Sequence, residues 1–507
     1  MSVRNSTRLG LSVSCGSPVA GLWCVVLGCT LAGCAVGPDF VRPEAPKVSR
    51  YSQGADPQAT ASAAGTAQHF EFGAQIAADW WHLFGSTKLD TVMAEAFANN
   101  PGLEAAQASL RQSQDYLRSG YGIFYPEIDA AAGASRQKYN PLKIGQNLPT
   151  SIFNLFTLSA TVNYALDVWG GERRMVEGLG AEVDLARATE QATYLALSAN
   201  IANTLIAKAA YRAELEATQQ LVELEKEQVR LSEVQAQAGT VPYANVLSLR
   251  SQLASVEATI PQIEQRLVQS DDLLATLAGH LPAEWSPPEV GLAELALPSK
   301  LPVSVPSDLV RQRPDILAAE ATVHAASANI GVATAALFPS ITLSGSYGSN
   351  GTSTNTLLAS RGNFWAFGVS AAAPLFDGGT LWFKRQAAID GYQQASATYR
   401  QTVLNAFEQV GDTLRALDHD AEILRAEEEA LAVAQQALHL VQASYDAGLA
   451  NYLDLLVSDA QYHQALVAEL QASAVRYQDT VALFAALGGG WWNAPPADSH
   501  GAEPTGE

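Results

Sequence analysis

The feature that most constrains this chain is a long stretch without proline, residues 171–237. Its residues are mostly Ala, Leu, Glu, Gln and Arg, which lose little conformational freedom in a helix. At ~1.5 Å per residue the predicted helix extends roughly 100 Å, several times the width of a compact domain. Gly239 and Pro242 follow it, and these residue types favour the end of one helix and the start of the next. The pattern predicts a long helical hairpin whose second helix runs from Asn245 to Leu277.

A second hairpin of the same kind is predicted in residues 384–488. Pro101 and Pro314 lie 213 positions apart, and Gly239 and Gly448 lie 209 positions apart. Because several kinds of element repeat at nearly the same spacing, we expect an internally duplicated chain. Gly239, Pro242 and Gly448 are then the predicted hairpin tips.

Between the predicted helices the apolar residues recur at every second position. Residues 156–166 alternate clearly, and residues 128–134, 341–347 and 365–373 alternate in the same manner. This period predicts four amphipathic strands. No apolar run after residue 35 approaches the ~20 residues of a membrane helix, whereas ~9 to 11 residues of a tilted strand cross a bilayer.

Four such strands cannot close a barrel, whereas three copies of the chain would supply twelve strands around an open interior. The predicted fold class is therefore an α+β membrane protein with four β-strands per chain. A homotrimer would complete a 12-strand barrel, continued by a 12-helix α-barrel tunnel. The alternative is a sandwich domain that carries a solid coiled coil, but clean heptads with Leu at a and d are missing.

The N-terminus has the pattern of a secretory signal. Two arginines precede an apolar run at residues 22–32, and the run ends in Leu31-Ala32-Gly33-Cys34. This tetrapeptide resembles a bacterial lipobox, which implies cleavage before Cys34 and attachment of diacylglycerol and an N-acyl lipid to it. Ala35, rather than Asp, implies sorting to the outer membrane. The alternative is a plain signal peptide with Cys34 placed by chance.

We therefore expect six segments along the chain: 1–33, lipoprotein signal peptide; 34–78, lipidated N-terminal tether; 79–281, first repeat of helix, two strands and long helical hairpin; 282–307, Pro-rich linker; 308–490, second repeat; and 491–507, polar C-terminal tail.

The residue types needed for catalysis or metal binding are not arranged in recognisable motifs. All four cysteines lie within the first 34 residues, and no two of the eight histidines are three to five positions apart. Phosphate-loop and GxSxG patterns are also missing. Asp167 and Asp377 stand beside glycines, where turn formation is the expected role. With a net charge of −21 the chain is a poor partner for nucleic acid, and we expect no enzyme, no metal and no cofactor other than the lipid.

Together these features resemble the outer-membrane factor family of TolC-like efflux ducts, and especially its NodT-type lipoprotein branch. The resemblance rests on five motifs, which are Gly33-Cys34-Ala35-Val36-Gly37-Pro38-Asp39-Phe40-Val41-Arg42-Pro43, Trp80-Trp81-His82-Leu83-Phe84-Gly85, Leu309-Val310-Arg311-Gln312-Arg313-Pro314-Asp315-Ile316, Pro374-Leu375-Phe376-Asp377-Gly378-Gly379 and Leu487-Gly488-Gly489-Gly490-Trp491.

The resemblance implies a trimer in the cell outer membrane whose tunnel extends into the periplasm. It also implies two protein partners, a periplasmic adaptor (membrane fusion) protein and an inner-membrane pump. At the periplasmic gate, Asp454 matches an acidic ring position and Tyr445 a tip tyrosine. In the family this tyrosine usually pairs with an acidic residue. The matching position here is Asn245, whose side chain could accept a neutral hydrogen bond worth ~1 kcal/mol.

The expected function is that of a passive exit duct through which a tripartite pump expels small toxic compounds. One alternative is the outer-membrane duct of a protein secretion system, which would have the same architecture. A structural coiled-coil outer-membrane lipoprotein is an alternative of a different class.

Overall fold

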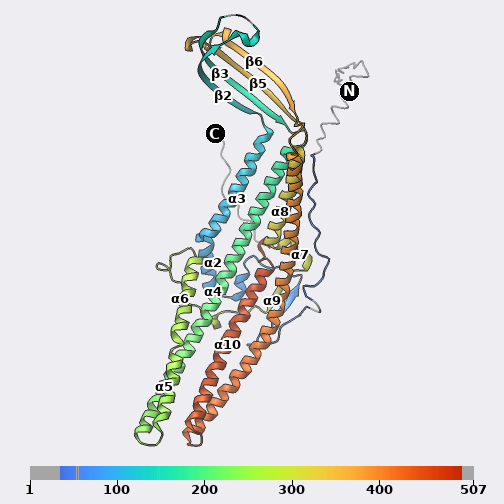
Figure 1. Cartoon of the computed structure of the whole chain (residues 1–507). Helices are drawn as coiled ribbons and strands as arrows, with labels where there is room; N and C mark the ends of the chain where they lie inside the picture. The colour runs from blue at the N-terminus through green and yellow to red at the C-terminus, as the bar shows by residue number, and fades with distance from the viewer. Residues whose placement is uncertain (1–34, 53, 55, 146, 148, 494–507) are drawn as a thin grey trace, which may run out of the picture. The chain divides into compact units, whose positions relative to one another are not determined.

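The computed structural model describes residues 35–493 except 53, 55, 146 and 148 (Figure 1). The expected signal peptide, Cys34 and most of the C-terminal tail lie outside the described residues. The helices are α2 (Thr87–Asn99), α3 (Pro101–Gly120), α4 (Gly171–Gln237), α5 (Tyr243–Glu257), α6 (Ile260–Leu277), α7 (Pro306–Gln312), α8 (Pro314–Ala335), α9 (Thr380–Asp446) and α10 (Tyr452–Ala486). The strands are β1 (His69–Phe72), β2 (Glu127–Tyr139), β3 (Ser151–Leu166), β4 (Lys300–Val303), β5 (Ser340–Gly351) and β6 (Asn363–Ala372).

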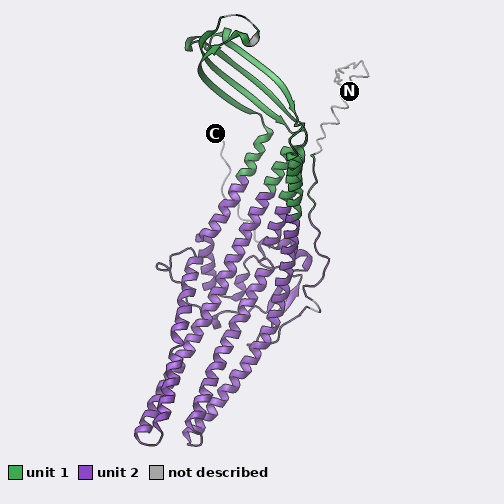
Figure 2. Ribbon diagram, viewed as in Figure 1, with its two compact units in different colours: residues 1–41, 115–180, 324–393 green, residues 42–114, 181–323, 394–507 purple. Residues whose placement is uncertain are grey.

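The chain forms two compact units, each built from segments of both predicted repeats (Figure 2). Unit 1 contains residues 1–41, 115–180 and 324–393, and unit 2 contains residues 42–114, 181–323 and 394–507. Unit 1 holds β2, β3, β5 and β6, and unit 2 holds most of the helical hairpins.

The four predicted strands of unit 1 form one antiparallel sheet in the order β2-β3-β5-β6. Ala160 of β3 lies opposite Ala130 of β2 on one side and Tyr347 of β5 on the other, and Tyr347 lies opposite Trp365 of β6. Since side chains alternate between faces along a strand, this register places the apolar positions of all four strands on one face. The opposite face is mostly small or polar and includes Thr161 of β3, Ser344 of β5 and Ser370 of β6.

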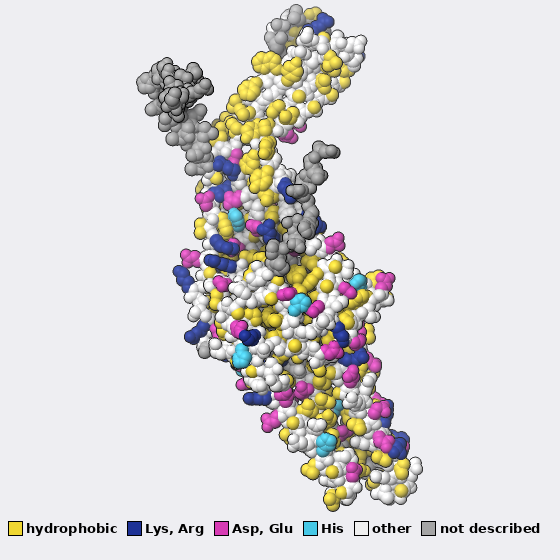
Figure 3. Space-filling view, turned by 180° about the vertical axis from the view of Figure 1, so that it is seen from behind, with side chains coloured by type: hydrophobic (Ala, Val, Ile, Leu, Met, Phe, Trp, Pro, Cys, Tyr) yellow, Lys and Arg dark blue, Asp and Glu magenta, His cyan; other side chains and the backbone are white. Residues whose placement is uncertain are grey.

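The apolar face of this sheet is covered by no other element of unit 1. Trp365 and Phe367 of β6 are 76% and 74% exposed, and Ile128 of β2 is 72% exposed. Hydrophobic side chains gather over these strands in the space-filling view (Figure 3). Strands β2 and β6 each pair with one neighbour, so both edges of the sheet are open. An open sheet with one exposed apolar face needs further surface to cover it.

Each long helix that follows the sheet begins at an aspartate cap. The carboxylate of Asp167 accepts hydrogen bonds from the backbone N–H groups of Glu172 and Arg173 at the start of α4. Asp377 accepts from the N–H groups of Gly379 and Leu381 at the start of α9. A carboxylate at a helix N-terminus satisfies free N–H groups and interacts favourably with the helix dipole. Both aspartates therefore have the turn-forming role expected from the sequence.

The helical hairpins occur where they were predicted, and α4 and α9 contain 67 residues each. We call α4 with α5 and α6 hairpin 1, and α9 with α10 hairpin 2. The return helix of hairpin 1 was predicted as continuous to Leu277, but it is interrupted at Ala258 and Thr259 between α5 and α6. Pro261 stands in the first turn of α6, and a proline inside a helix removes a backbone hydrogen bond. Hairpin 2 has no proline at the matching place, and α10 runs unbroken for 35 residues.

One helix differs from the expectation about apolar runs. Within the described residues, α8 has a mean hydropathy of 1.2 over an 18-residue window and is long enough to cross a membrane by length and composition alone. Its sequence includes charged residues near its N-terminus, such as Asp315 and Glu320, and 39% of that window is buried inside the molecule.

The core of unit 2 is aromatic where the predicted Trp80-Trp81 motif meets α10. The ring of Trp80 stacks on Phe484 with 5.3 Å between centroids, and both side chains are buried. Arg313 of the motif at residues 309–316 donates to both carboxylate oxygens of Asp315 and to the carbonyl oxygen of Ala486. These contacts tie the start of α8 to the end of α10.

The N-terminal arm, residues 35–78, is held in place along much of its length. In unit 2, β1 pairs in parallel with β4, a strand inside the segment predicted as a Pro-rich linker. Arg476 of α10 is 1% exposed and donates to the carbonyl oxygens of Ala63 and Thr66 and to the side chains of Gln68 and Thr60. These contacts hold residues 60–72 against β4 and α10, and the lipidated tether at residues 34–78 stays a prediction.

Candidate functional site

The predicted tips of the two hairpins are tight turns built on glycine. Gly239 has a φ of 75° and Gly448 a φ of 72°, a left-handed conformation that glycine adopts at little cost. In each turn an N–H group bonds back to the preceding helix, from Thr240 to the Gln235 carbonyl and from Leu449 to the Ser444 carbonyl. Pro242 is the residue just before α5, with a φ of −65° and a ψ of 141°.

Tyr445, the predicted tip tyrosine, bonds to hairpin 1 through a residue that sequence reasoning missed. Its hydroxyl donates to Gln235 Oε1 of α4 at 3.4 Å, and its ring lies edge-on to Tyr452 with 5.9 Å between centroids. Asn245, the predicted partner, lies in the first turn of α5 and is half-buried. The Tyr445 hydroxyl thus contacts the last turn of α4, whereas the link from Tyr445 to Asn245 of α5 stays a prediction.

Asp454 lies in the first turn of α10, where it completes a capping box. Its backbone N–H donates to Asn451 Oδ1 at 3.0 Å, and its carboxylate accepts from the Asn451 N–H at 3.3 Å. The side chain is exposed. Such reciprocal bonds fix the start of a helix and the direction of the carboxylate.

Above the tips, α4 of hairpin 1 and α10 of hairpin 2 meet along a row of polar residues that the sequence did not single out. Tyr452 donates to Gln228 Oε1 at 3.0 Å. Farther from the tips along the same two helices, Thr218 Oγ1 and His463 Nε2 lie 3.4 Å apart. Glu225 and Asp459 lie between these two contacts in the chain and are both buried. Thr218 and Glu225 are seven positions apart on α4, and so are Tyr452 and Asp459 on α10. This spacing places each pair on one face of its helix, and it was the signal in the sequence that could have revealed the row.

Burial changes the titration of this row. It raises the pKa of Glu225 to about 7, with the Asp459 carboxylate as the next cause, and raises the pKa of Asp459 to about 6. Burial also lowers the pKa of His463. Each shift favours the uncharged form, as expected for groups removed from water.

The described part of the arm nearest Cys34 docks on unit 1. The Val36 N–H donates to the carbonyl oxygen of Trp169 at 2.9 Å, directly after β3. Asp39 accepts from the buried guanidinium of Arg174 at 2.5 Å, and Phe40 stacks on His324 at 4.2 Å between ring centroids. The predicted motif at residues 37–40 therefore seats the arm on α4 and α8.

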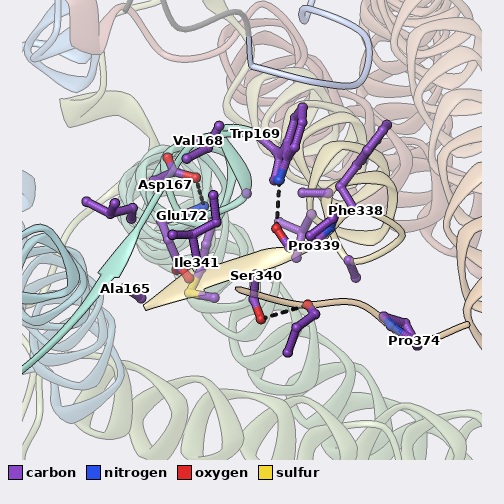
Figure 4. A pocket seen from close by; sticks show the side chains of 17 residues that line it. Ala165, Asp167, Val168, Trp169, Glu172, Phe338, Pro339, Ser340, Ile341 and Pro374 are labelled. Atoms are coloured by element: carbon purple, nitrogen blue, oxygen red, sulfur yellow. Dashed lines mark hydrogen bonds between the residues drawn. The ribbon is translucent and has the colours of Figure 1, made fainter. Parts of the chain in front are cut away.

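A cavity of about 310 Å³ lies beside the base of the sheet in unit 1 and has no arrangement typical of catalysis (Figure 4). Its lining includes Asp167, Glu172 and Trp169. The carboxylate of Asp167 is engaged by the start of α4, and the Trp169 indole donates to the Pro339 carbonyl at 2.8 Å. Across residues 35–493 with their four gaps, no group of three or more His, Cys, Asp or Glu side chains is placed to hold a metal ion.

Comparisons with known proteins agree with this architecture. A family model described as outer membrane efflux protein matches residues 92–280 and 305–489, more than half of the chain. The chain is 31% identical to the pyoverdine export outer membrane protein OpmQ of Pseudomonas aeruginosa, over 81% of this chain and 87% of that protein. It is 27% identical to the probable outer membrane lipoprotein SilC of Salmonella typhimurium, over 91% of this chain and 96% of that protein.

Among solved structures, the outer membrane protein VceC of Vibrio cholerae is similar, with a TM-score of 0.76 and 28% identity, over 82% of this chain and 100% of that chain. These relatives are proteins of the outer membrane, and the matching family is one of channels rather than enzymes. The chain belongs to the outer membrane efflux protein family and is an efflux channel of the cell outer membrane.

Proposed function

We propose that three copies of this chain assemble into a continuous exit duct. The four strands of each copy would complete a 12-strand barrel in the outer membrane, and the two hairpins of each copy would form a 12-helix tunnel in the periplasm. The observation that carries this proposal is the sheet of unit 1, whose apolar face is uncovered and whose two edges are open. Pairing β6 of one copy with β2 of the next removes the edges, and lipid covers the apolar face.

We further propose a lipid anchor on Cys34, made of diacylglycerol and an N-acyl chain. Val36 is bound to the end of β3, which supports a position for the acyl chains at the base of the barrel strands. Acyl chains in the bilayer and barrel strands through it would give each copy two attachments to the membrane.

The duct would be passive and would work with a periplasmic adaptor protein and an inner-membrane pump, which selects the cargo and supplies the energy. OpmQ is named for the export of pyoverdine, and by analogy small compounds are the proposed cargo. No cofactor beyond the lipid takes part in this proposal.

The gate of the duct would be the hairpin tips. Asp454 is exposed in the first turn of α10, and three copies would place three such carboxylates around the axis. The Tyr445 bond to Gln235 would hold hairpin 2 against hairpin 1, and opening would move hairpin 2 outward.

Two measurements test the duct. Purified protein is expected to run as a trimer and to give single-channel current in planar bilayers, whereas a folded trimer without current would refute the duct in favour of a structural protein. Deleting the gene is expected to lower tolerance to toxic small compounds. Loss of secreted proteins with unchanged tolerance would instead support a protein secretion duct.

A further inference from the structure

The contact between α4 and α10 contains two buried acids with no cation to balance them. Glu225 is 1% exposed and Asp459 is 2% exposed. Glu225 Oε2 and Asp459 Oδ2 both lack a hydrogen-bond partner in the described part of the chain. A buried carboxylate without a partner is costly in its ionised form and much less so when protonated. The packed arrangement of α4 and α10 therefore favours carboxyls that carry their protons.

The helices that surround this pair supply no compensating positive charge. Lys226, beside Glu225 on α4, directs its ammonium to Glu223 at 3.0 Å and to Glu257 of α5 at 3.8 Å. Gln252 of α5 is a neutral neighbour whose side chain opposes the effect of burial and lowers the pKa of Glu225 without reversing the shift.

Helices α9 and α10 complete these surroundings. Tyr452 and His463 of α10 bond to Gln228 and Thr218 of α4, so both are engaged elsewhere in the row. Tyr445 of α9 lies beside Tyr452, and His439 of α9 is exposed. The acids thus face neutral groups and one further carboxylate, Glu257.

We infer that Glu225 and Asp459 form a proton-operated contact, which fastens hairpin 2 to hairpin 1 when the carboxyls are protonated and loosens it when they ionise. The inference rests on the proposed function, because loosening α10 from α4 is the first part of the outward movement that would open the duct. The two carboxyls respond to protons alone. Because protonation fastens the hairpins, a more acidic periplasm would close the resting duct.

The sign follows from the direction of the shifts. With the hairpins packed, the pKa of Glu225 is about 7 and that of Asp459 about 6, and both fall toward ordinary values when water reaches them. The packed state therefore binds more protons, so acid stabilises it. This stabilisation is complete below the ordinary carboxyl pKa values and is lost as the pH rises toward 7. Since one pKa unit corresponds to tenfold in an equilibrium, going from about pH 8 to about pH 5 should favour packing by about tenfold or more.

The test is planar-bilayer recording of the full-length lipidated trimer at pH 8 and pH 5, for the natural protein, Glu225→Gln, Asp459→Asn and the double variant. The natural protein is expected to lose open probability by about tenfold or more at pH 5. The double variant, which mimics the protonated pair, is expected to stay at the low level at both pH values. Glu223→Gln is the matched control, because Glu223 lies on the same helix but is exposed. It should respond as the natural protein does.

Three outcomes would overturn the inference: current of the natural protein that does not depend on pH, a double variant with unchanged pH response, or opening in acid. A natural protein without current at any pH would instead overturn the duct itself. Gel filtration shows whether each variant remains a trimer. Infrared difference spectra between pH 8 and pH 5 give a second measurement, since the protonated carboxyl band should shrink in each single variant, and an unchanged band would also contradict the inference.

Discussion

Replacing Arg476 by alanine should release the N-terminal arm from the helices. The guanidinium is 1% exposed and makes four hydrogen bonds to the arm, of 3.0 to 3.3 Å. A hydrogen bond to a charged group contributes about 1.5 to 3 kcal/mol net of the exchange with water. Burial lowers the pKa of Arg476, which reflects that opposing cost.

The net loss should resemble that of breaking a buried charged contact. Arg476→Ala removes one of the two donors of the Ala63 and Thr66 carbonyl oxygens, which still accept each other's backbone N–H groups, so we expect a loss of about 1.5 to 3 kcal/mol or more. Arg476→Lys keeps the charge, but an ammonium group cannot reproduce the planar arrangement of donors in the guanidinium. We therefore expect an intermediate loss of unfolding free energy.

The assay is urea unfolding in detergent, followed by tryptophan fluorescence, because Trp80 stacks on Phe484 two turns along α10 from Arg476. Hydrogen exchange of residues 60–68 reports on the arm directly and should accelerate in Arg476→Ala. Arg230→Ala is the matched control: its side chain is 61% exposed and pairs with Glu227 one turn away, so a loss below about 0.5 kcal/mol is expected. If both alanine variants lose the same small free energy, the arm is not held by Arg476 and the reasoning fails.

Three further predictions concern the gate, the arm and the sheet. Asp454→Ala should raise conductance or remove block by multivalent cations in bilayer recordings, and unchanged conductance and block would exclude Asp454 from the gate. Gly37→Ala should undock residues 36–40 in hydrogen exchange, because φ is 95° and a Cβ would lie 2.5 Å from the α8 backbone; Gly54→Ala, with φ of 91° and open space, should leave them protected. Val369→Arg on the apolar face should cost about 2 to 4 kcal/mol near mid-membrane and reduce trimers in the outer membrane. Ser370→Arg on the other face should assemble normally, and equal yields would contradict the proposed lipid-facing side.

The elements of this fold could be predicted because each follows from a local pattern. The proline-free run fixed the bounds of α4, and alternation located all four strands of the sheet. Even the common apolar face was implied, since a register shift of one residue would turn a whole strand over. The break after α5 could also have been found from Pro261, whose backbone cannot donate the hydrogen bond that a continuous helix needs.

The contacts between elements could not be predicted in the same way. The partner of Tyr445 depends on which helix of hairpin 1 faces α9, and no periodicity encodes that choice. Glu225 and Asp459 are both buried only because the two hairpins pack against one another. Strand β4 is four residues long and contains Pro302, so it has neither the length nor the alternation by which a strand is recognised. Its pairing with β1 arises from packing rather than from local propensity.

The interruption between α5 and α6 limits the symmetry of the proposed trimer. Duplication alone would give six equivalent hairpins and a pseudo-sixfold axis. Hairpin 1, however, returns through two short helices and hairpin 2 through one continuous α10. The outer wall would then alternate between two kinds of groove, three of each. A partner that contacts every groove would therefore meet two kinds of site, three copies of each, with two affinities rather than one.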